Sequence, residues 1–146
     1  MPEVLLLSGP NLDLLGTRSP EIYGSMTLQE HVEAARSRAA AAGLSLRHLQ
    51  SNFEGDLIEA VHAARETSAG IIINAGALTH SSWALGDALA IFSGPKIELH
   101  LSNPAAREPF RHVSTLAGVV DGSLAGFGAL GYVLAVDAVA ALLAAR

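Results

Sequence analysis

Short runs of apolar residues, each bounded by polar or turn-forming residues, predict the strands of this chain. The run Gly70–Asn74 (GIIIN) has no polar side chain before its last residue, which is typical of a strand buried on both faces. The other predicted strands are Val4–Leu7, Leu44–Leu49, Lys96–Leu101 and a short fifth strand with its core at Val119–Val120.

Longer stretches with apolar residues three or four positions apart predict helices between these strands. The first begins at Thr27, where T-L-Q-E places Glu30 as in a capping box, and it ends near Gly43. Three more helices are predicted, at Asp56–Thr67, Trp83–Phe92 and Leu130–Ala145.

The alternation of strands and helices predicts an α/β fold in a single domain, residues 1–146. Five strands suit a flavodoxin-like three-layer sandwich, in which helices cover both faces of a five-stranded parallel sheet. Ligands of such sheets bind at the carboxyl ends of the strands, so we expect the polar residues that follow each strand to converge.

The Ser8–Gly24 connection is several times longer than a usual strand-to-helix loop, and it carries Asn11, Arg18 and Tyr23. Long ordered loops in compact domains are usually functional, so we predict an active-site loop. A lone tyrosine is more often packed in a core than used as a base. Nearby cations such as Arg18 or Arg107 would favour the ionised phenol that a base requires.

Side chains alternate along the strand Lys96–Leu101, so Glu98, His100 and Ser102 share one face. In a central strand this pattern indicates a carboxylate that orients an imidazole. In an edge strand it indicates only a solvated face, and periodicity alone does not separate the two.

Further polar side chains follow the third and fourth predicted strands. Asn74 and His80 follow the third, and Arg107 and Arg111 follow the fourth, four residues apart. Two arginines at this spacing share a face if the segment is helical, and they suit bidentate binding of a carboxylate. A solvated surface pair is the alternative, but the position after a strand favours anion binding.

Gly126–Gly131 (GFGALG) matches the G-x-G-x-x-G pattern of dinucleotide sites. Such a site needs a following strand with an acidic residue about 20 positions on, and only one helix follows here. We therefore interpret these glycines as allowing close packing of the last strand and helix. Lys96, the only lysine, begins a strand and is expected to be exposed. The histidines elsewhere show no metal-ligand spacing, so we expect no bound metal.

Composition narrows the function further. A net charge of −5 argues against general nucleic-acid binding, and half of the residues are hydrophobic, which favours oligomerisation. The apolar C-terminal segment is interrupted by glycines and by Asp137, so we expect a buried helix and no membrane span. There is no cysteine and no signal-peptide pattern, so we expect a cytoplasmic protein.

Five segments resemble, in order and spacing, the type II 3-dehydroquinate dehydratases (3-dehydroquinases), and they span nearly the whole chain. They are GPNLDLLGTRSPEIYG, SNFEGDLI, NAGALTHSSWALGDAL, ELHLSNPAAREPFRH and GFGALGYVLAV. The resemblance implies a flavodoxin-like fold, a homododecamer built from trimers, and no metal or cofactor. It implies reversible dehydration of 3-dehydroquinate to 3-dehydroshikimate, in the shikimate pathway of aromatic amino-acid biosynthesis or in quinate catabolism.

The resemblance also implies roles for the candidate residues. Tyr23 would be the base that removes a proton beside the ketone. His100, held by Glu98, would protonate the departing hydroxyl in an anti elimination through an enolate. Arg18 would lie on a mobile lid, and Asn11 near the enolate. The other implied partners of the substrate or of the tyrosine are Arg107, Asn74, His80, Arg111, the Leu101–Ser102 backbone and, reaching a neighbouring subunit's site, Asp87.

A few positions depart from the family pattern, and none is assigned to the chemistry. Ala75, Gly86 and Ala105 replace the usual Pro, Arg and His, and Ser8 and Asp13 stand where Asn is common. Two other functions stay open. A flavodoxin-like module for flavin or phosphate would need a loop richer in Ser, Thr and Gly than GPNLDLLG. Another lyase of cyclic hydroxy-ketones could use the same residues.

Overall fold

The computed structural model describes residues 1–146 and is built on a parallel sheet with the strand order β2-β1-β3-β4-β5. Each neighbouring pair of strands is parallel. This is the order of flavodoxin-like sheets, so the predicted α/β fold is confirmed. The strands are β1 (Glu3–Ser8), β2 (Ser45–Gln50), β3 (Gly70–Asn74), β4 (Lys96–His100) and β5 (Gly122–Ala125).

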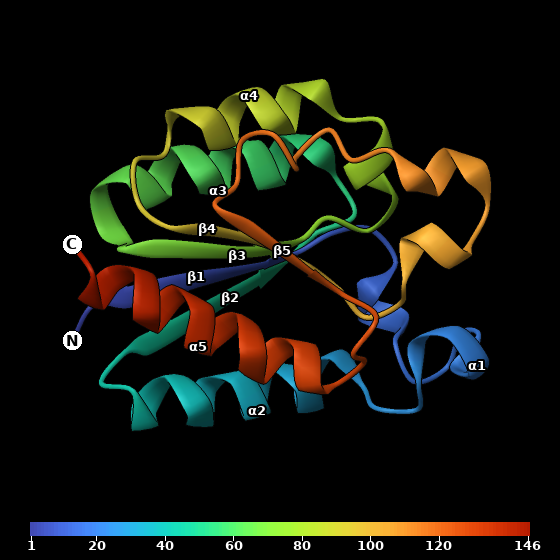
Figure 1. The fold of residues 1–146 in the computed structure, drawn as a ribbon, viewed down its shortest axis with the longest axis horizontal. Helices are drawn as coiled ribbons and strands as arrows, with labels where there is room; N and C mark the ends of the chain where they lie inside the picture. The colour runs from blue at the N-terminus through green and yellow to red at the C-terminus, as the bar shows by residue number, and fades with distance from the viewer.

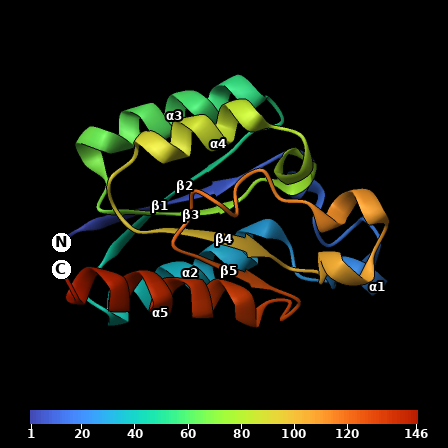
Figure 2. The ribbon, with the colours of Figure 1, turned by 45° about the horizontal axis from the view of Figure 1, so that its top comes forward.

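Helices cover both faces of this sheet, as Figures 1 and 2 show. α3 (Glu54–Thr67) and α4 (Trp83–Ile91) lie on one face, and α2 (Leu28–Ala41) and α5 (Leu130–Ala144) lie on the other. None of the helices combines the length and apolar content that crossing a membrane requires.

Alternation of side chains along β1 explains how the sheet packs against helices on both of its faces. Leu5 and Leu7 belong to the apolar core under α3 and α4, whereas Val4 and Leu6 belong to the core under α2 and α5. Successive side chains of a strand point to opposite faces, and a strand between two helical layers must therefore be apolar at every position.

The predicted ends of α2 are confirmed in detail. The Thr27 hydroxyl accepts a hydrogen bond from the Glu30 amide at 3.2 Å, and the Glu30 carboxylate accepts one from the Thr27 amide at 3.3 Å. At the other end Gly43 has a φ of 76°, and the Leu44 amide donates to the Ala39 carbonyl at 2.8 Å. This is the glycine-terminated C-cap that the sequence indicates.

The prediction for the fifth strand was wrong. β5 begins at Gly122, after the predicted core at Val119–Val120. The amides of both valines bond instead to the Leu116 carbonyl, in a turn that precedes the strand. Val119 packs against the core under α3 and α4, so its apolar character reflects burial of a turn and not strand pairing.

The expectation that Lys96 is exposed was also wrong. Its ammonium group donates to the carbonyls of Leu89 at 3.1 Å and Phe92 at 2.6 Å. The lysine therefore binds carbonyls at the C-terminal end of α4, where the Leu89 carbonyl also accepts from the Phe92 amide.

The glycines of GFGALG have two different roles. A Cβ at Gly131 would lie 2.9 Å from a methyl group of Leu99, so α5 packs closely on the sheet there, but on β4 and not on the last strand as predicted. Gly126 and Gly128 instead have φ values of 89° and 56°, and they form the turn between β5 and α5.

The carboxyl ends of the strands and the chain termini lie at opposite ends of the molecule (Figure 1). The short helix α1 (Pro20–Tyr23) lies at the carboxyl ends, together with two 3₁₀ helices, Pro104–Ala106 and Pro109–His112. The fold thus concentrates its irregular segments where ligands of parallel sheets bind.

A prediction concerns Gly9, directly after β1. A Cβ there would lie 2.4 Å from the Ala75 carbonyl oxygen, so Gly9→Ala should lower the free energy of unfolding by about 1–3 kcal/mol. Gly55→Ala is the control, because a Cβ on this residue of α3 meets nothing within 4 Å. It should stabilise the protein by about 0.5–1 kcal/mol. Urea denaturation of both variants tests this, and equal midpoints for wild type and Gly9→Ala would refute it.

Candidate active site

A pocket of about 160 Å³ opens at the carboxyl ends of β1, β3 and β4. Ten of the residues predicted from the sequence line it: Asn11, Arg18, Tyr23, Asn74, His80, His100, Leu101, Ser102, Arg107 and Arg111. Glu98 is buried and bonded to His100, whereas Asp87 is exposed on α4 and does not line the pocket. The expected convergence of the loops after the strands is thus observed.

The long loop after β1 is ordered by short helices and by two unusual backbone conformations. Asn11 has a φ of 69°, a left-handed conformation that asparagine tolerates better than most residues. Ser19 has a φ of 38° and precedes α1, whose first residue, Pro20, suits the start of a helix. Tyr23 is the last residue of α1, and Gly24 turns the chain away at a φ of 80°. This path places the tyrosine ring at the pocket.

Tyr23 is surrounded by positive charge. The Arg18 guanidinium donates to its hydroxyl at 3.3 Å, and the guanidinium carbon lies 4.5 Å from the ring centroid. The guanidinium carbon of Arg107 lies 5.1 Å from the same centroid. Two guanidinium groups therefore lie against one tyrosine at the pocket.

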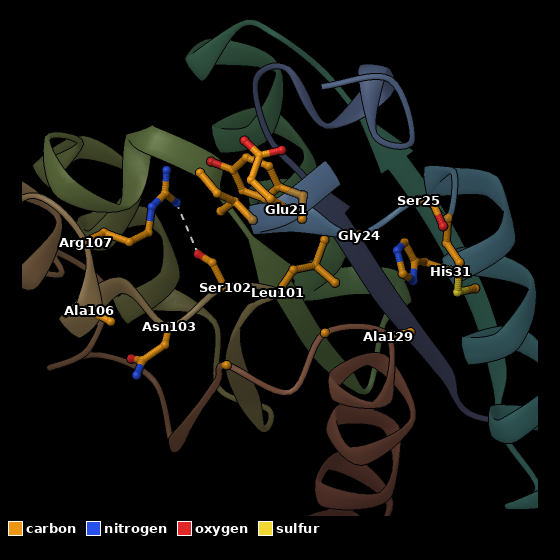
Figure 3. A pocket seen from close by; sticks show the side chains of 15 residues that line it. Glu21, Gly24, Ser25, His31, Leu101, Ser102, Asn103, Ala106, Arg107 and Ala129 are labelled. Atoms are coloured by element: carbon orange, nitrogen blue, oxygen red, sulfur yellow. Dashed lines mark hydrogen bonds between the residues drawn. The ribbon is translucent and has the colours of Figure 1, made fainter. Parts of the chain in front are cut away.

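Arg107 is held in place by few partners. It donates to the Ser102 hydroxyl at 3.1 Å, an interaction visible in Figure 3. Its Nε is buried without a hydrogen bond and lies 3.9 Å from the Glu108 carboxylate. Its charge is thus largely unneutralised beside the tyrosine and adds to the positive potential of the pocket.

Glu98 and His100 form a buried pair on β4, an interior strand. The imidazole Nε2 bonds to a Glu98 oxygen at 2.6 Å, and the Ser114 hydroxyl donates to the other oxygen at 2.8 Å. The edge-strand interpretation is wrong, because β4 lies between β3 and β5. Since a carboxylate accepts, Nε2 carries the hydrogen, and Nδ1 has no hydrogen bond within the protein.

Two further polar side chains of the pocket are fixed by local hydrogen bonds. His80 Nδ1 donates to the Val113 carbonyl at 2.7 Å, and its ring is 6.5 Å from the ring of His100. The Asn74 side-chain oxygen accepts from the Gly76 amide at 3.2 Å, so its amide nitrogen remains available.

Arg111 is oriented by its neighbour in the chain. Its Nε donates to Glu108 at 2.7 Å, and this bond is the main reason why the pKa of Glu108 is lowered. Its remaining guanidinium nitrogens are free to bind an anion. The lining of the pocket thus includes three arginines and no acidic residue, so the pocket favours an anionic ligand. No three His, Asp or Glu side chains cluster in a way that could hold a metal ion.

Two polar residues near the site were not predicted from the sequence. Ser114 comes from the segment before β5, and no pattern in the sequence connects it with Glu98. His31 of α2 is 2% exposed, and neither of its nitrogens has a partner. It is three residues after Leu28 on the same helical face, and this spacing could have identified it as buried.

The ring of His31 stacks on Tyr132 of α5, with centroids 4.8 Å apart and planes 13° apart. Burial lowers the pKa of His31 and raises the pKa of Tyr132 to about 12. The nearby Asn74 amide opposes this second shift slightly, without reaching hydrogen-bond geometry. Both rings are therefore neutral at neutral pH.

Comparison with known proteins shows similarity over nearly the whole chain. Residues 2–140 match the family model described as Dehydroquinase class II. A 3-dehydroquinate dehydratase of Ruegeria pomeroyi is 53% identical, over 97% of this chain and 95% of the relative. One from Xanthomonas oryzae pv. oryzae is 56% identical, over 98% and 97%. The crystal structure of type II dehydroquinase from Butyrivibrio crossotus has a TM-score of 0.92 and 38% identity, covering 94% of this chain and 97% of that chain.

The buried histidines lead to a prediction about pH. Burial lowers the folded-state pKa values of His31 and His48 below 6.5. For His48, the positive charge of Arg36 lowers the pKa further. The unfolded chain then binds protons that the folded protein excludes, so stability is present above pH 6.5 and is lost as the pH falls below it. Urea denaturation between pH 8 and pH 5 should show a smaller loss for His31→Leu than for wild type. Equal losses would contradict this account of His31.

Proposed function

Because the chain belongs to the class II dehydroquinase family and is a hydro-lyase, we propose that it dehydrates 3-dehydroquinate reversibly to 3-dehydroshikimate. The reaction is an anti elimination through an enolate. One observation carries the mechanism: a tyrosine hydroxyl bonded by Arg18 shares an arginine-rich pocket with the buried Glu98–His100 pair.

Tyr23 is the base of the first step. The ring methylene beside the ketone is weakly acidic, so the step needs a strong base and a stabilised enolate. The phenolate takes the proton, and the electron pair of the C–H bond passes into the enolate. Arg18 and Arg107 stabilise the negative charge before and during the transfer. Asn11 lies at the pocket wall and stabilises the enolate through a water molecule.

His100 is the acid of the second step. The enolate collapses, the C–O bond to the departing hydroxyl breaks, and the imidazolium Nδ1–H supplies the proton that makes water the leaving group. Glu98 holds the ring through Nε2 and stabilises the imidazolium. Ser114 in turn orients Glu98, because its hydroxyl donates to the second carboxylate oxygen.

The substrate carboxylate binds at the arginine-rich side of the pocket. The Leu101–Ser102 backbone, Asn74 and Arg111 supply donors around it, and His80, whose Nδ1–H bonds to Val113, lines the pocket beside them. Arg18 lies in a lid between Gly16 and Tyr23, and the lid closes over the substrate and excludes water. The left-handed Ser19 within it is consistent with a segment that changes conformation.

The active form is a cytoplasmic homododecamer built from trimers. Trp83, Asp87 and Ile91 are four residues apart on α4 and are all exposed, so they form one stripe on the helix surface. Phe110 and Val113, beside the pocket, are exposed as well. Contact between such a stripe and a neighbour's pocket would bury these apolar side chains and bring Asp87 to that pocket.

The test of the base is Tyr23→Phe, assayed by the ultraviolet absorbance of the conjugated enone formed from 3-dehydroquinate. Loss of the phenol should lower kcat by about 1,000-fold, within the usual contribution of a positioned base. Tyr132→Phe is the matched control, because its buried hydroxyl has no partner and is outside the reaction. It should retain activity. A wild-type enzyme without enone formation would refute the reaction, and an active Tyr23→Phe would refute the base.

The positioning role of Glu98 is tested by Glu98→Gln. The amide keeps the shape but removes the charge that stabilises the imidazolium, so kcat should fall roughly 100-fold with little change in KM. Ser114→Ala removes only one bond to the carboxylate and should cost less than tenfold. An unchanged kcat would exclude the acid role of the pair.

A further inference from the structure

A second cavity, of about 510 Å³, lies beside the active-site pocket. The two share Tyr23, Leu101, Ser102 and Arg107, which form the wall between them. Figure 3 shows Arg107 and Ser102 at one end of this cavity and His31 and Ala129 at the other. The proposed reaction uses only the shared wall, so the end with His31 and Ala129 has no assigned role.

The far end is the N-terminus of α5. Gly128 and Ala129 line the cavity there, and Ala129, the N-cap residue, provides no side-chain hydrogen bond to the helix. The amides of Ala129 and Leu130 make no hydrogen bond within the protein. Free amides and the positive end of the helix dipole attract an anion.

His31 supplies an independent indication of a ligand at the same place. The residue is only 2% exposed, it lines the cavity, and neither ring nitrogen has a hydrogen-bond partner. Buried polar groups in folded proteins are normally hydrogen-bonded. Its stacking on Tyr132, in the first turn of α5, places it next to the free helix amides.

The rest of the lining limits the kind of anion. Ile22, Met26, Ala106 and Leu101 give the cavity an apolar wall suited to a ring or chain. The charges of Glu21 and Arg107 cancel in the formal sum, so the attraction for an anion comes from the helix end and the imidazole N–H. A fully hydrated inorganic ion would leave the apolar wall unused.

We propose that this cavity, the His31–α5 site, binds a small carboxylate with an apolar body. The carboxylate lies at the amides of α5 and at His31, and the body lies along Leu101 toward Tyr23. Since Tyr23 and Arg107 belong to the shared wall, a bound ligand changes turnover without occupying the substrate pocket. The kinetic effect rests on the proposed function, whereas the binding does not.

Binding is tested on the full chain without substrate, with benzoate as the probe and His31 observed by NMR. The imidazole signals should shift and saturate with benzoate. Benzamide, the neutral isostere, should bind at least about tenfold more weakly, as expected for loss of a charged hydrogen-bond partner. No saturable shift at millimolar benzoate overturns the proposal. Equal binding of inorganic phosphate overturns the requirement for an apolar body.

Variants at the helix end separate this site from the active-site pocket. Ala129→Asp places a like charge at the anion position and should weaken benzoate binding about tenfold, while the aspartate caps the helix. Ala129→Asn caps the helix without the charge and should bind within about threefold of wild type. His31→Leu should weaken binding about tenfold. If all three bind as wild type does, benzoate lies elsewhere and the proposal is wrong.

Enzyme kinetics test whether benzoate in the His31–α5 site changes turnover. Benzoate should alter kcat in wild type without a proportional change in KM, and Ala129→Asp should abolish this effect. Purely competitive inhibition that is unchanged in Ala129→Asp would place benzoate in the substrate pocket and overturn the proposal. Inactivity toward 3-dehydroquinate would refute the proposed function and leave the NMR result standing.

Discussion

A carboxylate buried in an interior strand is stable only when its oxygens are hydrogen-bonded, and the active site is organised by this constraint. Glu98 satisfies it with one bond to His100 and one to Ser114. The first bond fixes the imidazole at the end of β4, and the second ties the segment before β5 to the strand. The two bonds that stabilise the buried charge of Glu98 therefore also fix the orientation of His100, the candidate acid.

Positive charge on the opposite side of the pocket completes the arrangement. Arg18 comes from the long loop after β1 and Arg107 from the segment after β4, and both reach Tyr23. The parallel sheet makes this meeting possible, because it places the carboxyl ends of neighbouring strands side by side. An arginine-rich pocket favours an anionic ligand, because its positive charges attract one.

The wall formed by Tyr23, Leu101, Ser102 and Arg107 has a cavity on each side. The larger cavity ends at the uncapped N-terminus of α5, where GFGALG turns the chain. The motif lacks the following strand of a dinucleotide site. Its glycines, however, carry no side chains that could cover the end of the helix. A turn that is required for packing can thus also leave amides available to a ligand.

The sequence by itself determined four of the five strands, the four long helices, the capping of α2 and most of the residues that line the pocket, because periodicity and strand-end position are local signals. It could not decide whether β4 was central or at an edge, because alternation is the same in both. The prediction at Val119–Val120 was wrong because a turn that packs partly on the core can be as apolar as a strand. Only the tertiary structure placed Lys96 on the end of α4, Ser114 on Glu98 and His31 against Tyr132. Those contacts join segments distant in the chain, and no local pattern encodes them.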